Sequence, residues 1–364
     1  MRNIIACLAL LNLLLSCNSD SDSANTTTPE ETMYFPPTSE TTWETKSLNS
    51  LNWNETAVAP LLTYLNDKHT KSFILLVNGR IVMENYFNGQ TASDNWYWAS
   101  AGKTLTSTLT GIAQQEGLLN INNKVSDYLG TGWTSVPLAK ENLITCKHLL
   151  TMTSGLDDAY NDSSDPTTDD CVLPDCLMYK SDAGTRWAYD NVYVKLQDVV
   201  ANASGQNWNT YFNTRLRDKI GMNGNWITVN NNSVYTSTAR SMARFGLLAL
   251  NKGNWNGTQI VSSGYFDQAA TTSQSINLAY GYLWWLNGKA NYHLPQTQLQ
   301  FSGSLIPSAP SDMYCALGKN DQKIYIIPSK KMVIIRMGDT ADGANMALSD
   351  FDEVLWQKIK ALYE

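Results

Sequence analysis

Ser100 and Lys103 stand three positions apart at the start of a segment in which apolar residues recur at helical spacing. Gly117 is placed to end that run, so we expect a helix with Ser100 at its N-terminal end and Lys103 beside it across one turn. A serine becomes a nucleophile when a base removes its proton, and a lysine kept partly deprotonated can be that base. The first N–H groups of the helix suit a developing oxyanion. The tetrapeptide alone also fits a helix cap followed by a solvated lysine.

A second group with chemical potential is Tyr189, at the start of another helical pattern, followed by Asn191. A tyrosine that faces a lysine can relay protons, and an amide two residues later can bind both the lysine and a substrate. On its own, a tyrosine at a helix start is more often a packing residue.

A serine–histidine–aspartate site has little support, because the chain has three histidines and no G-x-S-x-G sequence. We expect His148, on a short apolar helix, to be a hydrogen-bonded structural residue.

The elements that must position these groups lie at both ends of the chain. Residues 72–77 and 80–86 read as two strands joined by Asn78-Gly79, a strong hairpin signal. Residues 313–317, 323–327 and 332–337 read as three more strands, and helical patterns run over 54–65 and 348–362. We therefore predict an α+β fold: an antiparallel sheet of about five strands flanked by N- and C-terminal helices, with an inserted, mainly helical domain at about 125–280. A cleft between the two parts is the natural ligand site.

The first 46 residues read as a targeting segment and a tether. An apolar run over residues 4–15 is too short to span a bilayer and ends just before Ser16-Cys17, so residues 1–16 are predicted to be a lipoprotein signal peptide. Cys17 would become a lipidated N-terminus, anchoring an exported protein to a bacterial envelope membrane on its periplasmic or cell-surface side. The alternative is a secreted protein with an incidental cysteine. Residues 17–46 are acidic and predicted to be a disordered tether, leaving 47–364 as the folded domain.

Charge and cysteines restrict the possible partners. The net charge is −7, with no basic run longer than Lys330-Lys331, so we expect no nucleic-acid partner. In an oxidising compartment Cys171 and Cys176 are a candidate disulfide, whereas the pairing of Cys146 and Cys315 is not deducible from sequence. The loop from Asp157 to Asp175 contains seven aspartates but lacks the glycine and glutamate of a calcium hand, so a solvated acidic loop is favoured. We expect neither a metal nor another cofactor.

Five motifs occur in a characteristic order: Ser100-Ala101-Gly102-Lys103, residues 148–156, Tyr189-Asp190-Asn191, residues 237–240 with 245–247, and residues 280–285. Together they resemble the beta-lactamase-related serine hydrolases, a family that includes class C beta-lactamases, DD-peptidases, esterases and 6-aminohexanoate-dimer hydrolases. The resemblance runs from about residue 72 to 336 and implies the beta-lactamase/transpeptidase-like fold.

The resemblance also implies roles for residues. Ser100 would form an acyl-enzyme, Lys103 and Tyr189 would share the proton transfers, and Asn191 would orient Lys103 and the substrate. The oxyanion hole would combine the Ser100 N–H with one from the strand that carries a third motif.

The third motif is where this chain departs from the family, which usually has Lys-Thr-Gly or His-x-Gly. The aligned stretch is residues 318–322, in which Lys319 would supply the cation and Gln322 the second oxyanion N–H. Asp321 would replace the small glycine and bring a negative charge to the place where a beta-lactam carboxylate docks. We therefore expect beta-lactams to be poor substrates.

Two functions remain open at this level. The first is a serine hydrolase of esters or amides acting on a small-molecule or peptide substrate, with beta-lactams or D-amino-acid peptides as the alternative substrate class. The second is a weakly catalytic or non-catalytic cell-envelope protein that binds peptides or other ligands on the same scaffold. The altered Asn320-Asp321 and the aromatic runs 96–98 and 284–285, which could line a groove, motivate the second function.

Overall fold

The computed structural model describes residues 31–39, 41–158, 170–229, 231–343 and 348–364. The chain divides into two compact units, Met1–Thr32 and Met33–Glu364, and almost all of the first lies outside these ranges. The predicted signal peptide and Cys17 therefore lie outside the described residues. In the ranges given above, no helix is long and apolar enough to cross a membrane.

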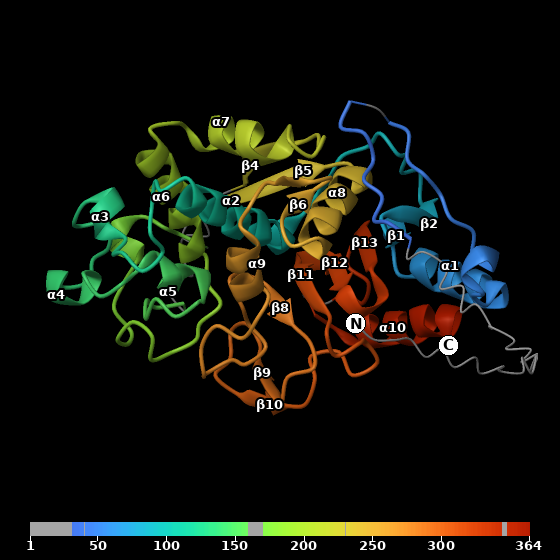
Figure 1. The fold of residues 1–364 in the computed structure, drawn as a ribbon. Coiled ribbons are helices and arrows are strands. Elements are labelled where there is room, and N and C mark those ends of the chain that lie inside the picture. Colours follow the sequence, from blue (N-terminus) through green and yellow to red (C-terminus); the bar gives the residue numbers. More distant parts are fainter. Residues whose placement is uncertain (1–30, 40, 159–169, 230, 344–347) are drawn as a thin grey trace, which may run out of the picture. The chain divides into compact units, whose positions relative to one another are not determined.

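The centre of the second unit is an antiparallel sheet of six strands in the order β2-β1-β13-β12-β11-β8. Strands from the two ends of the chain lie side by side in it (Figure 1). The five predicted strands are all present, and short β8 is added at the edge. Asn78 and Gly79, between β1 and β2, both have positive φ, as the predicted hairpin turn requires. The strands are β1 (Thr70–Val77), β2 (Arg80–Tyr86), β8 (Trp285–Leu286), β11 (Tyr314–Gly318), β12 (Gln322–Ile327) and β13 (Met332–Gly338).

Helices cover both faces of this sheet. The predicted terminal helices, α1 (Val58–Asp67) and α10 (Asp350–Tyr363), pack against each other, and the Trp356 ring of α10 lies 5.4 Å from that of Tyr325 on β12. On the other face α8 (Ala239–Leu250) packs against β12 and β13. A Cβ on Gly246 of α8 would come within 2.5 Å of Val333 and 3.3 Å of Ile324, so glycine allows this close approach. Side chains of β12 therefore alternate between α8 and α10.

The remaining helices lie between β2 and β8 in sequence, and α2 (Lys103–Gln115) precedes the predicted insertion of about 125–280. Although α8 falls within the predicted insertion of about 125–280, it belongs to the sheet layer because its apolar face is buried against the strands. The other helices are α2 (Lys103–Gln115), α3 (Ser126–Leu129), α4 (Leu138–Glu141), α5 (Cys146–Leu150), α6 (Lys195–Ser204), α7 (Trp208–Phe212) and α9 (Ser263–Ala269). Smaller sheets are formed by β3 (Trp96–Tyr97), β5 (Asn232–Ser237) and β4 (Asn225–Val229), by β6 (Asn254–Trp255) and β7 (Thr258–Gln259), and by β9 (Asn291–His293) and β10 (Gln300–Ser302).

The folded unit begins at Met33, earlier than residue 47, where the sequence placed it. The segment assigned to the end of the tether lies along the hairpin of β1 and β2. Lys46 donates its N–H to Ile81, and the Trp43 indole donates to the carbonyl of Gly79 at 2.7 Å. These contacts could not be predicted from the acidic composition of the segment, because the backbone and one tryptophan make them.

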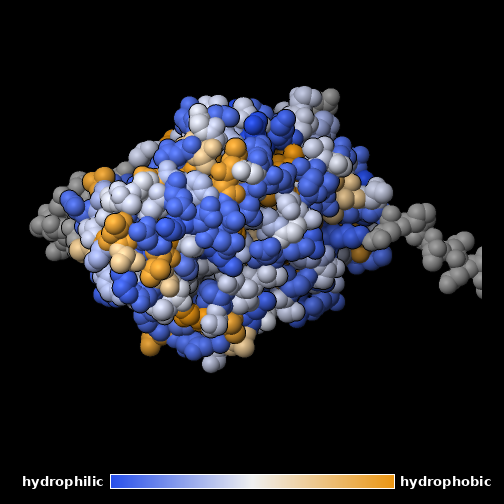
Figure 2. Space-filling view, turned by 60° about the vertical axis from the view of Figure 1, so that its left-hand side comes forward, coloured by the Kyte–Doolittle hydropathy of each residue, from blue (hydrophilic) through white to orange (hydrophobic). Residues whose placement is uncertain are grey.

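The surface of the helical part is mainly hydrophilic. Figure 2 shows, on the face turned forward, apolar side chains in small patches separated by polar ones. Large apolar residues that are exposed include Leu138, Leu143 and Tyr179. Isolated residues of this kind are normal on a protein surface.

Candidate active site

Ser100 lies on a tight connection between a strand and a helix. The chain leaves β3, forms a 3₁₀ turn over Ala99–Gly102, and enters α2 at Lys103. Trp98, which is fully buried, holds this connection: its N–H bonds to Tyr235 O and its indole donates to Ser237 Oγ at 2.8 Å. Ala99 has a φ of 46°, a strained conformation for a residue with a Cβ. Ser100 is thus presented by the turn before the helix, and not by the helix itself.

Lys103 and Ser100 are in direct contact. Lys103 Nζ lies 2.9 Å from Ser100 Oγ, as the predicted spacing requires. The Lys103 side chain is buried, with 6% of the residue exposed. This burial lowers its pKa to about 8, and the negative charges of Asp170 and Asp190 only partly oppose the effect. A substantial fraction of Lys103 is therefore neutral near pH 8 and able to accept a proton.

Two tyrosine rings enclose the Lys103 amine. Nζ lies 4.8 Å from the ring centroid of Tyr189 and 4.3 Å from that of Tyr193. Burial raises the pKa of the Tyr189 hydroxyl above its usual range, although a hydrogen bond with Ser100 opposes this. Tyr189 is thus a neutral phenol in contact with the serine. Sequence reasoning missed Tyr193, although its position four residues after Tyr189 was a usable signal, since such residues share a helix face.

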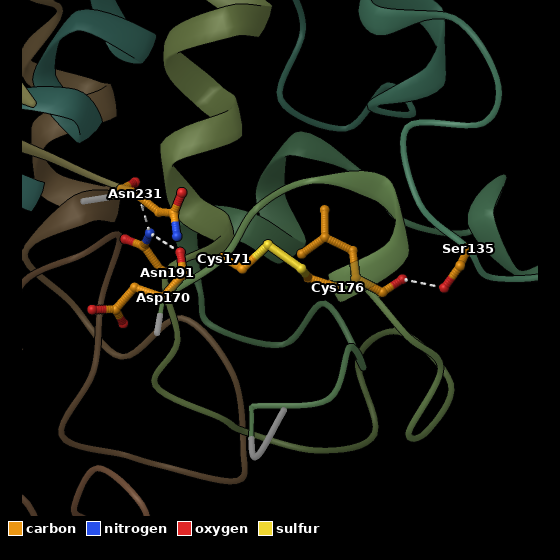
Figure 3. Close-up of a disulfide and its surroundings, with 7 residues drawn as sticks. Ser135, Asp170, Cys171, Cys176, Asn191 and Asn231 are labelled. Carbon is orange, nitrogen blue, oxygen red and sulfur yellow. Dashed lines mark hydrogen bonds between the residues drawn. A yellow bond between two sulfur atoms is a disulfide. The ribbon is translucent and has the colours of Figure 1, made fainter. Parts of the chain in front are cut away.

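Asn191 is buried, but its amide nitrogen is directed elsewhere than expected. Nδ2 donates to the backbone carbonyls of Asp170 at 2.7 Å and Asn231 at 3.3 Å. These hydrogen bonds hold neighbouring loops (Figure 3). The side-chain oxygen Oδ1, which would accept from the Lys103 amine, is buried without a hydrogen-bond partner among the described residues, so the predicted hydrogen bond between Asn191 and Lys103 is not made.

The sequence alignment placed Asp321 where the family has a glycine, but the strand edge that faces Ser100 does carry a glycine, Gly318. A Cβ added there would lie 2.5 Å from Trp98 O and 3.0 Å from Ala101 N, so the end of β11 is pressed against the turn that bears Ser100. The residue that follows on this edge is Lys319, whose side chain is exposed. The sequence alignment of the third motif was therefore out of register.

Gln322 is a structural residue. It pairs with Gly318 across the β11–β12 ladder and is fully buried. Its Nε2 donates to Gly338 O at 2.6 Å, and its Oε1 accepts from Gly338 N at 3.1 Å. Both ends of the side-chain amide are thus used in joining β12 to β13. The backbone N–H that follows Gly318, the residue pressed against the Ser100 turn, is that of Lys319 and not the expected one of Gln322.

Asp321 points away from Ser100, and the expectation that its charge enters the substrate site is wrong. It is 2% exposed, with Oδ1 3.1 Å from Lys323 Nζ and Oδ2 accepting the Ala341 N–H at 3.0 Å. Lys323 also lies 2.8 Å from Asp352 of α10. Since alternate residues of a strand face the same side, Asp321 follows Lys323 and Tyr325 toward α10. The carboxylate of Asp321 is buried and paired with Lys323. It therefore repels a docking anion much less than the sequence analysis expected.

Arg336 holds the turn between β11 and β12. Its guanidinium is fully buried and donates to Asn320 O at 2.9 Å and Asp321 O at 3.1 Å. Both residues have φ near 60°, the left-handed region that non-glycine residues avoid. Hydrogen bonds from Arg336 therefore stabilise a strained turn next to Gly318.

Three of the five residues in the aromatic runs pack in the core, whereas Trp96 and Tyr97 are half-buried. Trp98 and Trp284 are fully buried and Trp285 is 4% exposed, so these three rings do not line an open groove. His148 accepts the Thr145 N–H at 3.1 Å and caps α5, which confirms its structural role. The predicted disulfide between Cys171 and Cys176 is present.

Comparisons with known proteins agree with this fold. The model of the family described as Beta-lactamase matches residues 67–355. An uncharacterised protein of Alkalihalophilus pseudofirmus is 24% identical over 306 residues, 73% of this chain and 82% of that protein. A putative 6-aminohexanoate-dimer hydrolase from Bacillus anthracis superposes with a TM-score of 0.67 at 20% identity, covering 92% of each chain. EstCE1, a hydrolase with promiscuous acyltransferase activity, gives 0.65 at 11% identity, covering 87% of this chain and 99% of its own. The chain therefore belongs to the Beta-lactamase family, whose members are generally serine hydrolases.

Proposed function

We propose that this protein hydrolyses esters or amides through an acyl-enzyme intermediate on Ser100. The observation that carries the proposal is the 2.9 Å contact between Ser100 Oγ and the amine of Lys103, a buried lysine whose pKa is lowered to about 8. A hydroxyl beside a partly neutral amine is the pair that nucleophilic catalysis needs.

The first half-reaction assigns one role to each side chain. Neutral Lys103 takes the Ser100 proton as Oγ attacks the substrate carbonyl. The Ser100 N–H, in the 3₁₀ turn that precedes α2, faces the developing oxyanion together with the Lys319 N–H after Gly318. As the intermediate collapses, the phenol of Tyr189 donates its proton to the leaving group and is re-protonated by Lys103. This order follows from the raised pKa of Tyr189, which makes it a proton donor and not a base.

Deacylation uses the same base. Lys103 is neutral again once its proton has left through Tyr189, so it can take a proton from the water that attacks the acyl group. Ser100 Oγ leaves with a proton returned by the Lys103 amine, and the free enzyme is restored.

Esters and amides are the substrates we favour, because the aligned neighbours include a putative 6-aminohexanoate-dimer hydrolase and a hydrolase with promiscuous acyltransferase activity. Beta-lactams and D-amino-acid peptides remain alternatives. Beta-lactams were expected to be repelled by the charge of Asp321, but that carboxylate is buried and paired with Lys323. The non-catalytic binding protein is less well supported, since the altered turn leaves the Ser100–Lys103 pair in place and Trp98, Trp284 and Trp285 are core residues.

The proposal is tested on the wild-type protein. We expect turnover of p-nitrophenyl acetate, and stoichiometric labelling by a fluorophosphonate probe that peptide mapping places on Ser100. A protein with no ester, amide, D-alanyl-D-alanine peptide or nitrocefin turnover and no label on Ser100 would not be a serine hydrolase.

A substitution at Gly318 tests the proposed oxyanion site. Gly318→Ala is expected to lower kcat/KM about 100-fold, because its Cβ would meet Trp98 O and push β11 away from Ser100. The backbone of Gly318, with φ −129° and ψ 152°, suits alanine, so the contact alone produces the effect. Gly264→Ala is the matched control, since only Ser262 Oγ, at 3.7 Å, lies near the added Cβ. Equal activity of both variants would exclude this edge from the oxyanion site.

A further inference from the structure

A hydrogen bond between Tyr97 and Asn320 joins the two segments that carry the N–H groups of the proposed oxyanion site. Asn320 Nδ2 donates to the Tyr97 hydroxyl at 2.7 Å. Tyr97 is the last residue of β3, three positions before Ser100, whereas Asn320 directly follows Lys319. The bond therefore connects side chains that lie close in sequence to the two donors, the Ser100 N–H and the Lys319 N–H.

The backbone of Asn320 is held independently of its side chain. Its carbonyl accepts from Gln322 Nε2 at 2.8 Å and from Arg336 Nη1 at 2.9 Å, and both donors belong to fully buried residues. With φ 61°, Asn320 lies in the left-handed region, which asparagine enters more often than most residues other than glycine. Asparagine thus allows this turn and also supplies a side-chain donor, whereas glycine would only allow the turn.

Tyr97, the other partner, is braced against the central sheet. It lies opposite Thr236 in the pairing of β3 with β5, and it is half-buried. Its ring packs on that of Trp96, with centroids 5.5 Å apart. Trp96 in turn donates its indole N–H to the carbonyl of Gly338, at the end of β13, at 3.2 Å. The Tyr97 hydroxyl therefore offers Asn320 an acceptor on a segment that is itself held in place.

The hydrogen bond supplies what the close approach at Gly318 does not. The space for a Cβ at Gly318 is limited by Trp98 O at 2.5 Å and Ala101 N at 3.0 Å, so this contact sets how near the two segments can come. A steric contact only keeps atoms apart, whereas a hydrogen bond resists their separation. This matters because a displacement of about 1 Å in a catalytic site can cost about 100-fold in rate.

We propose that Tyr97 and Asn320 are positioning residues that keep the Lys319 N–H directed at the oxyanion formed from the carbonyl that Ser100 attacks. This inference rests on the proposed function, because it concerns the oxyanion site of the same reaction. Asn320 acts through the backbone of its neighbour Lys319, and Tyr97 acts through Asn320. The altered turn, which motivated the binding-protein function, then serves catalysis.

The test measures kcat/KM for p-nitrophenyl acetate across pH in Asn320→Gly and Tyr97→Phe. Glycine keeps the left-handed backbone and phenylalanine keeps the ring, so each variant removes one partner of the hydrogen bond. We expect each to lower kcat/KM about 10-fold at every pH, a smaller loss than removal of an oxyanion donor itself. The inflection that Lys103 produces near pH 8 should not move, since the base is unchanged.

Phenylboronic acid tests the oxyanion site directly. It adds to Ser100 Oγ as a tetrahedral boronate, which places one oxygen where the oxyanion develops. Its inhibition constant should therefore rise in both variants by a factor similar to the fall in kcat/KM, as expected for an analogue of the transition state.

The double variant and two matched controls complete the experiment. Tyr97→Phe/Asn320→Gly should lose no more than the larger single loss, because both changes break one hydrogen bond. Tyr128→Phe removes a hydroxyl that accepts from Asn123 Nδ2 at 3.2 Å, a bond of the same kind at α3. Asn256→Gly makes the other change at an exposed left-handed asparagine between β6 and β7. Both controls should keep the wild-type kcat/KM.

Four results would overturn the proposal. They are a wild-type kcat/KM in the single variants, losses that multiply in the double variant, an inflection that moves with the substitutions, and an unchanged inhibition constant for phenylboronic acid. If one single variant does not fold, the other decides, because they change different segments. In each case the wild type would still turn over the ester and carry the label on Ser100. A wild type without turnover and label would instead contradict the proposed function.

Discussion

Ser100→Ala should lower kcat/KM for p-nitrophenyl acetate by at least about 1,000-fold and abolish fluorophosphonate labelling, because no acyl-enzyme can form without Oγ. The change removes one oxygen atom from a turn that is held by Trp98 and not by the serine. We therefore expect the thermal unfolding midpoint to stay close to that of the wild type. Competitive inhibitors should still bind, since both aromatic neighbours of Lys103 remain.

Ser126→Ala is a suitable control for this experiment. The Ser126 hydroxyl is buried without a hydrogen-bond partner, so its removal should change neither stability nor turnover. Residual turnover in Ser100→Ala that equals the wild-type rate would mean that another group attacks the substrate. A loss of both turnover and inhibitor binding would indicate that the turn itself had been disturbed.

Much of the sheet could be predicted because its signals are local. An Asn-Gly pair marks the first hairpin, and apolar strands bounded by turn residues mark the other three, so each predicted strand overlaps an observed one with ends that differ by at most two residues. The Ser100–Lys103 contact was predictable for the same reason, since it spans a single turn. The packing of α8 against the sheet was not predictable. Helical periodicity shows that one face of a helix is buried, but it does not show which element covers that face.

The third motif could not be placed from local sequence patterns. Gly318 is required by a contact with Trp98, more than 200 positions earlier, and no local pattern announces such an approach. The direction of the Asp321 side chain was easier to predict than the contact of Gly318. Lys323 and Tyr325 share its strand face, and a lysine two residues from an aspartate at that spacing indicates a pair. The second partner of Lys323, Asp352, comes from α10, so the buried cluster as a whole is a property of the tertiary fold.

Lys103→Met should lower kcat/KM by about 1,000-fold, within the range expected for the loss of a general base. Methionine has a similar length and is apolar, so it can occupy the space between the Tyr189 and Tyr193 rings. The wild-type profile of kcat/KM should rise with pH and level off near pH 8, the pKa of Lys103, and this inflection should be absent from the variant. Lys103→Arg should be equally inactive, since a guanidinium stays protonated throughout this range. Exposed Lys252 provides the control substitution Lys252→Met.

The same substitution should make the protein more stable. The pKa of Lys103 is lower in the folded chain than in the unfolded one, so the unfolded state binds more protons between about pH 8 and pH 10, and stability rises with pH across this window. The resulting cost to stability is complete below pH 8 and disappears as the pH rises toward the unfolded value. Lys103→Met removes this cost while losing the hydrogen bond to Ser100, and we expect a net gain of about 1 to 3 kcal/mol at pH 7. Urea unfolding at pH 7 and pH 10 measures it. A less stable variant at pH 7 would mean that the buried ammonium is held by compensating contacts, and Lys103 would then lose its basis as a catalytic base.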